Sequence, residues 1–292
     1  MAIASISPEI PGDRAARGAA LPTPLIIQPT GSWAALNLGD VWAHRELLYF
    51  LVWRDLKVRY KQTALGVAWV LLQPLFMTLI FTAVFGNLVR VPSSSIPYTL
   101  FAYSGLTFWL FFSSAVSVTG NCLVANANLI TKVYFPRLII PVAAIMARLV
   151  DLGISLVILF GLMVFYHVGI TSHLLMLPVM ILLVSLLALG FGLWMSAVNV
   201  KYRDVGLALP VLIQLWMFVC PIVYPITQVP EKWRFVYSLN PLVGIIDGSR
   251  AALLGTPFLW PAIAISAVFT ALLLPYAAYS FVIREKIFAD VI

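Results

Sequence analysis

The amino-acid sequence predicts an all-α polytopic membrane protein with six transmembrane helices, and three observations support this fold class. Hydrophobic residues make up 62% of the 292 residues and charged residues only 10%, whereas soluble domains are about 45–50% apolar and about 25% charged. The mean hydropathy is +1.00. Six segments also reach the length of about 20 apolar residues that crosses a bilayer. These values place the chain in the membrane class.

The six expected spans form a transmembrane domain over residues 63–292. They are residues 65–89, about 98–124, about 138–165, 174–198, 205–224 and about 258–283. Pro74 removes a backbone donor from the first span and is expected to bend it. Pro141 falls in the first turn of the third span, where proline is tolerated.

Two segments precede the spans. Residues 1–39 contain five prolines, and their only apolar run, residues 25–27, is too short for a signal-peptide core of about 7–15 residues. This segment is predicted to be a disordered cytoplasmic tail. Residues 40–62 are predicted to form an amphipathic helix in the membrane interface.

The pattern of residues 40–62 is aromatic on one helical face and basic on another. Rings at headgroup depth and cations facing water are typical of an interfacial helix. A soluble helix packed on another domain is the alternative. The residues that we assign to this helix are Trp42, Tyr49, Trp53, Arg54, Lys57, Arg59 and Tyr60.

The distribution of cations predicts the orientation. With the amino terminus inside, thirteen of the 18 Lys and Arg residues are cytoplasmic, four are outside, and Arg148 lies within the third span. Because cytoplasmic loops carry the excess of Lys and Arg, both termini are expected to be cytoplasmic. The net charge of +7 is therefore explained by membrane orientation, and no nucleic-acid partner is expected.

The segment between the last two spans, about residues 226–256, is predicted to be a re-entrant helical hairpin on the outer side. Asn240 and Pro241 suit the start of a helix, and Gly255 suits its end. Asp247 and Arg250 lie one turn apart within it. An external loop with a surface helix is the alternative interpretation.

Motifs for catalysis are missing from the sequence. No Gly-Lys pair occurs, so there is no Walker-type phosphate loop, and no His-Glu-x-x-His motif or metal-ligand cluster is present. Cys122 and Cys220 are expected to be buried thiols. Arg148 and Asp151 are the one clear charged pair within a span, either a self-satisfied pair or a functional one. With so few membrane acids, energy for transport has to come from a separate ATPase.

A short polar island interrupts the apolar sequence between the second and third spans. It is predicted to be a short cytoplasmic helix, about residues 126–137, that a partner protein contacts and moves. Its candidate contact residues are Asn126, Asn128, Leu129, Ile130, Lys132, Tyr134, Phe135 and Arg137.

Four stretches resemble one family. Residues 53–74 (Trp-Arg-Asp-Leu-Lys-Val-Arg-Tyr-Lys-Gln-Thr, then on to Gln-Pro) are similar to the opening signature of polysaccharide-export ABC permeases of the Wzm/TagG-like type. Residues 128–137, 199–204 and 237–241 also match that family's pattern, in the right order. The resemblance covers about residues 45–285.

The resemblance implies a half-transporter in the bacterial cytoplasmic membrane. Two copies form a channel, and a separate ATPase subunit, which binds ATP and Mg, docks on the coupling helix at 126–137. The chain itself binds no cofactor. The substrate is an undecaprenyl-type lipid-linked polysaccharide, and the helix at 40–62 acts as a gate. Aromatic rings stack on sugar faces, so the candidate channel residues are Trp69, Phe76, Trp109, Trp216 and Tyr224.

Two alternatives remain at this point. Type-2 ABC permeases that export drugs or small lipids share the same plan of spans. A multi-span membrane enzyme or scaffold without transport is the second alternative, and a polar catalytic cluster at one membrane face is the feature that identifies it.

Overall fold

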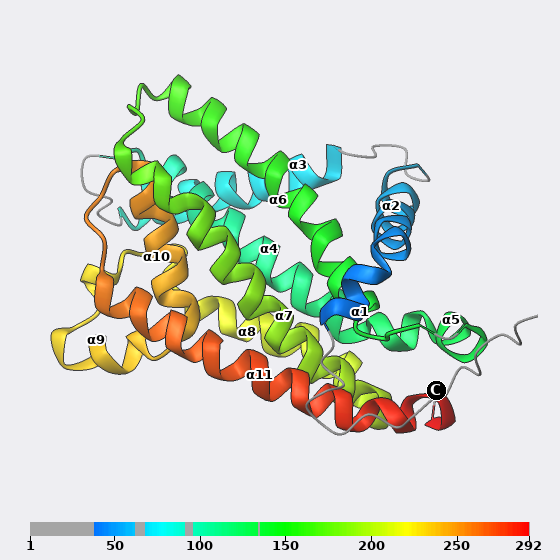
Figure 1. Ribbon diagram of the computed structural model, residues 1–292. Helices are drawn as coiled ribbons and strands as arrows, with labels where there is room; N and C mark the ends of the chain where they lie inside the picture. Colours follow the sequence, from blue (N-terminus) through cyan, green and yellow to red (C-terminus); the bar gives the residue numbers. More distant parts are fainter. Residues whose placement is uncertain (1–37, 62–67, 91–95, 134, 292) are drawn as a thin grey trace, which may run out of the picture. The chain divides into compact units, whose positions relative to one another are not determined.

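The computed structural model describes residues 38–61, 68–90, 96–133 and 135–291 (Figure 1). Every regular element in these ranges is a helix. The predicted tail lies outside the described residues apart from its last two positions, and Tyr134 also lies outside them.

Five helical stretches within the described residues are long and apolar enough to cross a membrane. The first is α3 (Ala68–Phe81), which continues as a π-helix (Thr82–Leu88). The others are α4 (Tyr98–Ala125), α6 (Ile139–Phe165), α7 (Leu177–Lys201) with the 3₁₀ turn η2 (Ser172–Met176) before it, and α11 (Trp260–Val291). The expected spans at 98–124 and 138–165 agree with these bounds to within a residue or two.

The expected fifth span, residues 205–224, is shorter in the structure than in the prediction. α8 (Asp204–Phe218) has 15 residues, and a helix of that length rises about 22 Å, against a hydrocarbon core of about 30 Å. After α8 the chain turns, with the Ile222 amide donating to the Cys220 carbonyl at 2.8 Å. Apolar composition continues through this turn, so the sequence pattern extended the helix too far.

The amino-terminal helix of the prediction is present as two helices. α1 (Leu38–Ala43) carries Trp42, and α2 (Arg45–Lys61) follows after a turn at His44. On α2 the rings of Tyr49 and Trp53 are exposed, whereas Leu51 is buried. These two rings therefore point away from the packed core.

The π-helix that continues α3 ends just before the backbone changes hand. Pro74 lies buried inside α3, and the π-helix ends at Leu88 with Val89 as its C-cap. Arg90 follows with a φ of 55°, the left-handed conformation that commonly ends a helix.

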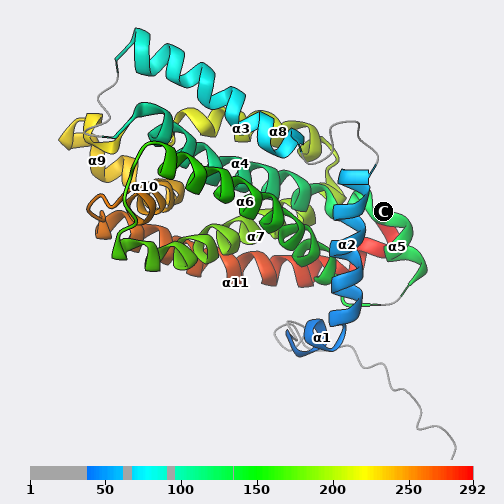
Figure 2. The ribbon, with the colours of Figure 1, turned by 90° about the horizontal axis from the view of Figure 1, so that it is seen from above.

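The helix α4 lies at the centre of the packing, in contact with α3, α6, α7, α8 and α10. In Figure 2, α4 and α7 lie between α3 and α8 on one side and α11 on the other. One apolar cluster around Phe108 and Phe112 fills the space between α4, α6, α7 and α10. A second cluster joins α2 and the end of α4 to α6, α7 and α11.

The segment between α8 and α11 forms three helical pieces. These are η3 (Ile226–Gln228), α9 (Glu231–Ser238) and α10 (Pro241–Leu254). The predicted helix boundaries are confirmed for α10: the Asn240 side chain accepts from the Leu242 amide at 3.1 Å, and Gly255 ends the helix with a φ of 70°. α10 packs on α11, α4 and α7.

Candidate functional site

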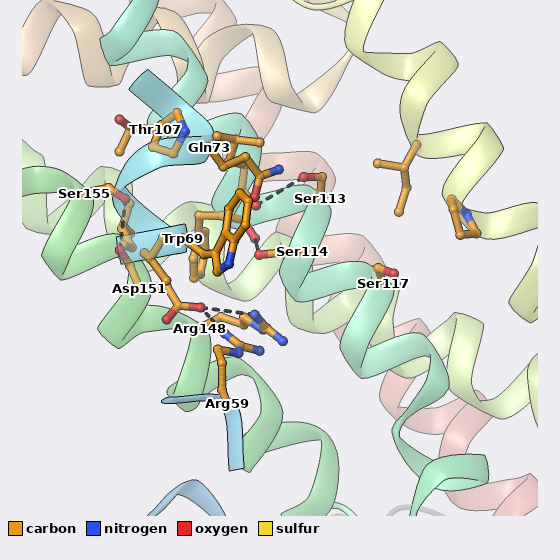
Figure 3. A pocket seen from close by; sticks show the side chains of 17 residues that line it. Arg59, Trp69, Gln73, Thr107, Ser113, Ser114, Ser117, Arg148, Asp151 and Ser155 are labelled. Carbon is orange, nitrogen blue, oxygen red and sulfur yellow. Dashed lines mark hydrogen bonds and ion pairs between the residues drawn. The ribbon is translucent and has the colours of Figure 1, made fainter. Parts of the chain in front are cut away.

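A cavity of about 450 Å³ lies between α3, α4, α6 and α8, beside the end of α2 (Figure 3). Its wall combines hydroxyl groups, one indole ring and three charged side chains. The lining residues are Arg59, Trp69, Val70, Gln73, Pro74, Thr107, Leu110, Phe111, Ser113, Ser114, Ser117, Arg148, Asp151, Leu152, Ser155, Pro210 and Ile213.

One face of α4 forms the hydroxyl wall, because Thr107, Ser113, Ser114 and Ser117 recur at helical spacing. The Ser113 and Ser114 hydroxyls each donate to a carbonyl one turn back at 3.1 Å, and Thr107 does the same at 2.9 Å. A hydroxyl has one donor and two acceptor lone pairs. With their donors already used, these groups offer acceptors to a ligand that is rich in O–H donors.

The charged wall is centred on Asp151 of α6. The Arg148 guanidinium binds the Asp151 carboxylate at 3.1 Å, and Arg59 and Tyr60 of α2 bind the same carboxylate. The predicted Arg148–Asp151 pair is therefore part of a four-residue cluster that joins two helices. Burial and the nearby carboxylate raise the pKa of the Tyr60 phenol, so this residue stays a neutral O–H donor.

Arg148 has a donor that the cluster does not use. Its Nε atom is buried and finds no hydrogen-bond partner among the described residues. A buried donor without a partner costs about 1–3 kcal/mol, so the cluster is incompletely satisfied in this conformation.

The five candidate channel aromatics are distributed over the whole molecule. Trp69 lines the cavity, and Phe76 is exposed on the same helix. Trp109 is buried in the apolar cluster around Phe112, so its ring does not line the cavity. Trp216 packs edge-on against Phe112 and donates from its indole to Asn240 at 3.2 Å, while the Tyr224 hydroxyl donates to the Phe218 carbonyl.

Sequence reasoning missed the hydroxyl wall and Gln73. Serine and threonine at positions 107, 113, 114 and 117 follow helical spacing on the predicted second span, and that spacing was the available signal. Arg59 was assigned to the gate helix alone. The structure also places it in the wall of the cavity.

The predicted coupling segment contains a short helix, α5 (Ala127–Lys132). Ile130 and Phe135 are buried in the second apolar cluster and hold the segment against the helix bundle. Among the described residues of this segment, the exposed side chains are Asn128, Thr131, Lys132 and Val133, and Leu129 is half-buried. These residues offer a surface for contact.

Two polar contacts fix the ends of this segment. Asn126 accepts a hydrogen bond from Arg54 of α2 at 2.9 Å, and the Arg137 guanidinium donates to the Glu285 carbonyl of α11. Lys57 of α2 is exposed. The segment therefore contacts α2, near the start of the described chain, and α11 at its end.

The segment between α8 and α11 is organised by Arg250 of α10, which is only 3% exposed. Its guanidinium donates to the carbonyls of Phe101 at 3.2 Å and Ile222 at 2.6 Å, and also to that of Pro221. The Phe101 ring lies 3.7 Å from the guanidinium carbon. Arg250 thus ties α10 to the start of α4 and to the turn after α8.

Comparison with known proteins identifies the family. The model of the ABC-2 type transporter family matches residues 46–254. An O-antigen export system permease protein, RfbA, from Myxococcus xanthus is 30% identical over 256 residues, which cover 86% of this chain and 97% of that protein. An RfbA from Klebsiella pneumoniae is 30% identical over 211 residues, which cover 72% of this chain and 80% of that protein.

A further relative transports a different polymer. The polysialic acid transport protein KpsM from Escherichia coli is 27% identical over 207 residues, which cover 69% of this chain and 78% of that protein. The family match spans more than half of the chain and includes α2, the cavity, α5 and α10. This chain belongs to the ABC-2 type transporter family.

Proposed function

We propose that this chain is the membrane subunit of an exporter that carries a lipid-linked polysaccharide of the O-antigen, capsule or teichoic-acid type across the bacterial cytoplasmic membrane. The observation that carries the proposal is the cavity, in which the Trp69 ring faces a wall of hydroxyl acceptors (Figure 3). Sugars present apolar C–H faces to rings and O–H donors to acceptors. The names of the three relatives, which transport O-antigen or polysialic acid, support the same substrate class.

Two copies of the chain form the channel in this proposal. A volume of about 450 Å³ is in the range of about 300–1,000 Å³ that holds a drug-sized ligand. It is too small to be a continuous passage for a polymer. A second copy of the chain, facing the cavity from the side of α3 and α8, supplies the missing wall.

A separate ATPase subunit drives the transport and holds the ATP and Mg. α5 and the residues after it, which expose Asn128, Lys132 and Val133, supply the docking surface. With α5 on the cytoplasmic side, both termini are also cytoplasmic. α8 and the turn after it complete a sixth crossing, and α9 and α10 form the re-entrant hairpin. Co-purification of an ATPase with the tagged chain tests the partnership, and a V133D chain is expected to lose the ATPase while still reaching the membrane.

Complementation tests the substrate class directly. A strain lacking this chain is expected to lose surface polysaccharide and to accumulate lipid-linked polymer inside. Wild-type chain restores export, whereas W69A restores only a small part of it. W260A is the matched control, because Trp260 lies outside the lining of the cavity and is 55% exposed, against 56% for Trp69. Equal export by W69A and W260A contradicts the proposal.

The cavity volume also favours a second candidate, export of a drug or small lipid, because about 450 Å³ suits a molecule of that size. The same strain separates the two. Under this second function it keeps its surface polysaccharide and becomes sensitive to an exported drug or loses a lipid from its outer leaflet.

A further inference from the structure

We propose that α2 transmits movement of the coupling segment to the charged wall of the cavity, with Arg54 and Asp151 as positioning residues at the two contacts. This inference rests on the proposed function, because it assumes that an ATPase moves α5. It adds a path by which that movement reaches the cavity. Three contacts of α2 carry the argument.

The first contact is polar and lies where α4 meets α5. Arg54 donates from Nη2 to the Asn126 side-chain oxygen at 2.9 Å, and Asp55 holds the same guanidinium at 2.8 Å. Asn126 is fixed in turn, because its side-chain nitrogen donates to the Cys122 carbonyl at 2.8 Å. Since Asn126 is the last position before α5, a tilt of α5 pulls on Arg54.

The second contact is apolar. Leu51 of α2 is 2% exposed and belongs to the same packed cluster as Ile130 and Phe135 of the coupling segment. Leu47, Leu48 and Val52 of α2 pack against that cluster. Protein interiors are close-packed and transmit displacement, so a shift of these two buried anchors of the coupling segment displaces the cluster that holds Leu51.

The third contact lies in the cavity wall. Arg59 and Tyr60 follow Arg54 by five and six residues, which is about 7.5–9 Å along a helix. Both bind Asp151 of α6. The 17 residues of α2 include no glycine or proline, so the helix has none of the usual sites of kinking and moves as one piece.

In this proposal the cluster around Asp151 alternates between two discrete arrangements, and the structure shows the first of them. With α2 docked, Asp151 Oδ2 binds Arg59 and Arg148 while Oδ1 binds Tyr60, and the Arg148 Nε stays without a partner among the described residues. When α2 withdraws, both carboxylate oxygens become available to Arg148, whose guanidinium then turns to form the two-bond fork with its Nε and Nη2. The Arg59 guanidinium then leaves the wall, so a movement at α5 changes the charge that the cavity presents to its substrate.

The experiment measures coupling between ATP hydrolysis and export in membrane vesicles that contain the complete transporter with its ATPase. R54A, N126A and D151N are compared with wild-type, and E46A is the control because Glu46 is exposed on the same helix, outside the gate residues and the cavity wall. The first three variants are expected to hydrolyse ATP at near the wild-type rate and to export about tenfold less polymer for each ATP, while E46A stays normal. If R54A does not accumulate, R54Q replaces it, because the glutamine amide keeps a donor but loses the reach and the charge.

Two further results separate this inference from the proposed function. The R54A/N126A double variant is expected to be no worse than either single variant, since both remove the same contact. Wild-type export per ATP in R54A and N126A overturns the inference, and so does a fall of ATP hydrolysis in proportion to export. If instead the proposed function is wrong, the result is different, because the V133D chain then keeps its ATPase.

Discussion

The two ends of α4 are built differently, and the difference indicates which end moves. At its first end, Phe101 is held by the buried Arg250, and three main-chain carbonyls accept from one guanidinium. At its last end, the six residues of α5 are held by two buried apolar anchors and a few polar contacts, and most of its other side chains are exposed. α4 has 28 residues, so these ends are about 42 Å apart.

Many bonds to buried main chain make a fixed region, whereas few buried contacts make one that opens at low cost. We therefore interpret the Arg250 end as the fixed frame of the proposed exporter and the α5 end as the part that the proposed ATPase moves.

The largest effect is expected from R250A. Removing the guanidinium leaves the carbonyls of Pro221 and Ile222 without this donor, whereas the Phe101 carbonyl keeps the Ser104 hydroxyl. Each unsatisfied buried group costs about 1–3 kcal/mol. The chain is expected to accumulate poorly and to lose thermal stability in detergent. R250K keeps part of the donor set and is expected to fall between R250A and wild-type. A melting temperature of R250A equal to that of wild-type contradicts the fixed-frame interpretation.

The next effect is expected from G244A in α10. A Cβ at this position lies 2.2 Å from the Ala262 carbonyl oxygen of α11, so the two helices have to separate, at a cost of about 1–3 kcal/mol. G153A in α6 is the matched control, because nothing lies within 4 Å of a Cβ there. The melting temperature is expected to fall for G244A and to stay level or rise for G153A, since alanine favours helix by about 1 kcal/mol over glycine.

A smaller effect, on function alone, is expected from the triple variant S113A/S114A/S117A. It removes the acceptors of the hydroxyl wall but leaves the helix intact, because each hydroxyl bonds only locally or faces the cavity. Export is expected to fall about tenfold, which corresponds to about 1.4 kcal/mol of lost substrate interaction. Quantified surface polysaccharide gives the measurement, and unchanged export shows that the wall does not contact the substrate.

The smallest effect is expected from K132E at the end of α5. Lys132 is exposed, and a single exposed charge contributes only about 0–1 kcal/mol to an interface. Affinity for the ATPase is therefore expected to fall by about fivefold or less, and the loss is expected to grow at low salt. Titration of the ATPase onto detergent-solubilised chain at two salt concentrations measures both quantities.

Local patterns in the sequence predicted the long helices well. The bounds of α4 and α6 follow from continuous apolar runs, and Asn240, Pro241 and Gly255 mark the ends of α10 because caps are local. α8 was predicted too long. Its end at Phe218 is set by a turn whose carbonyls accept hydrogen bonds from Arg250, about 30 residues further along the chain. No local sequence pattern predicts that contact.

The cavity was predictable only in part, for the same reason. Trp69 was among the five candidate aromatics, and the charged pair Arg148–Asp151 was recognised from its spacing. The contacts of Arg59 and Tyr60 with Asp151 join residues 92 and 91 positions apart in the chain. Which aromatics reach a cavity depends on helix rotation, and a helix that is apolar on all sides carries no signal for it.

The most direct test of the central claim compares distances at the two ends during ATP turnover. Cys122 and Cys220 are buried, so spin labels can be directed to introduced cysteines. One pair is K57C with M146C, between α2 and α6, and the other is F165C with W260C, between the ends of α6 and α11; all four positions are exposed. In the complete transporter we expect ATP to change the first distance by several ångströms and to leave the second unchanged. A first distance that ATP does not alter, or a second that changes as much, contradicts the account.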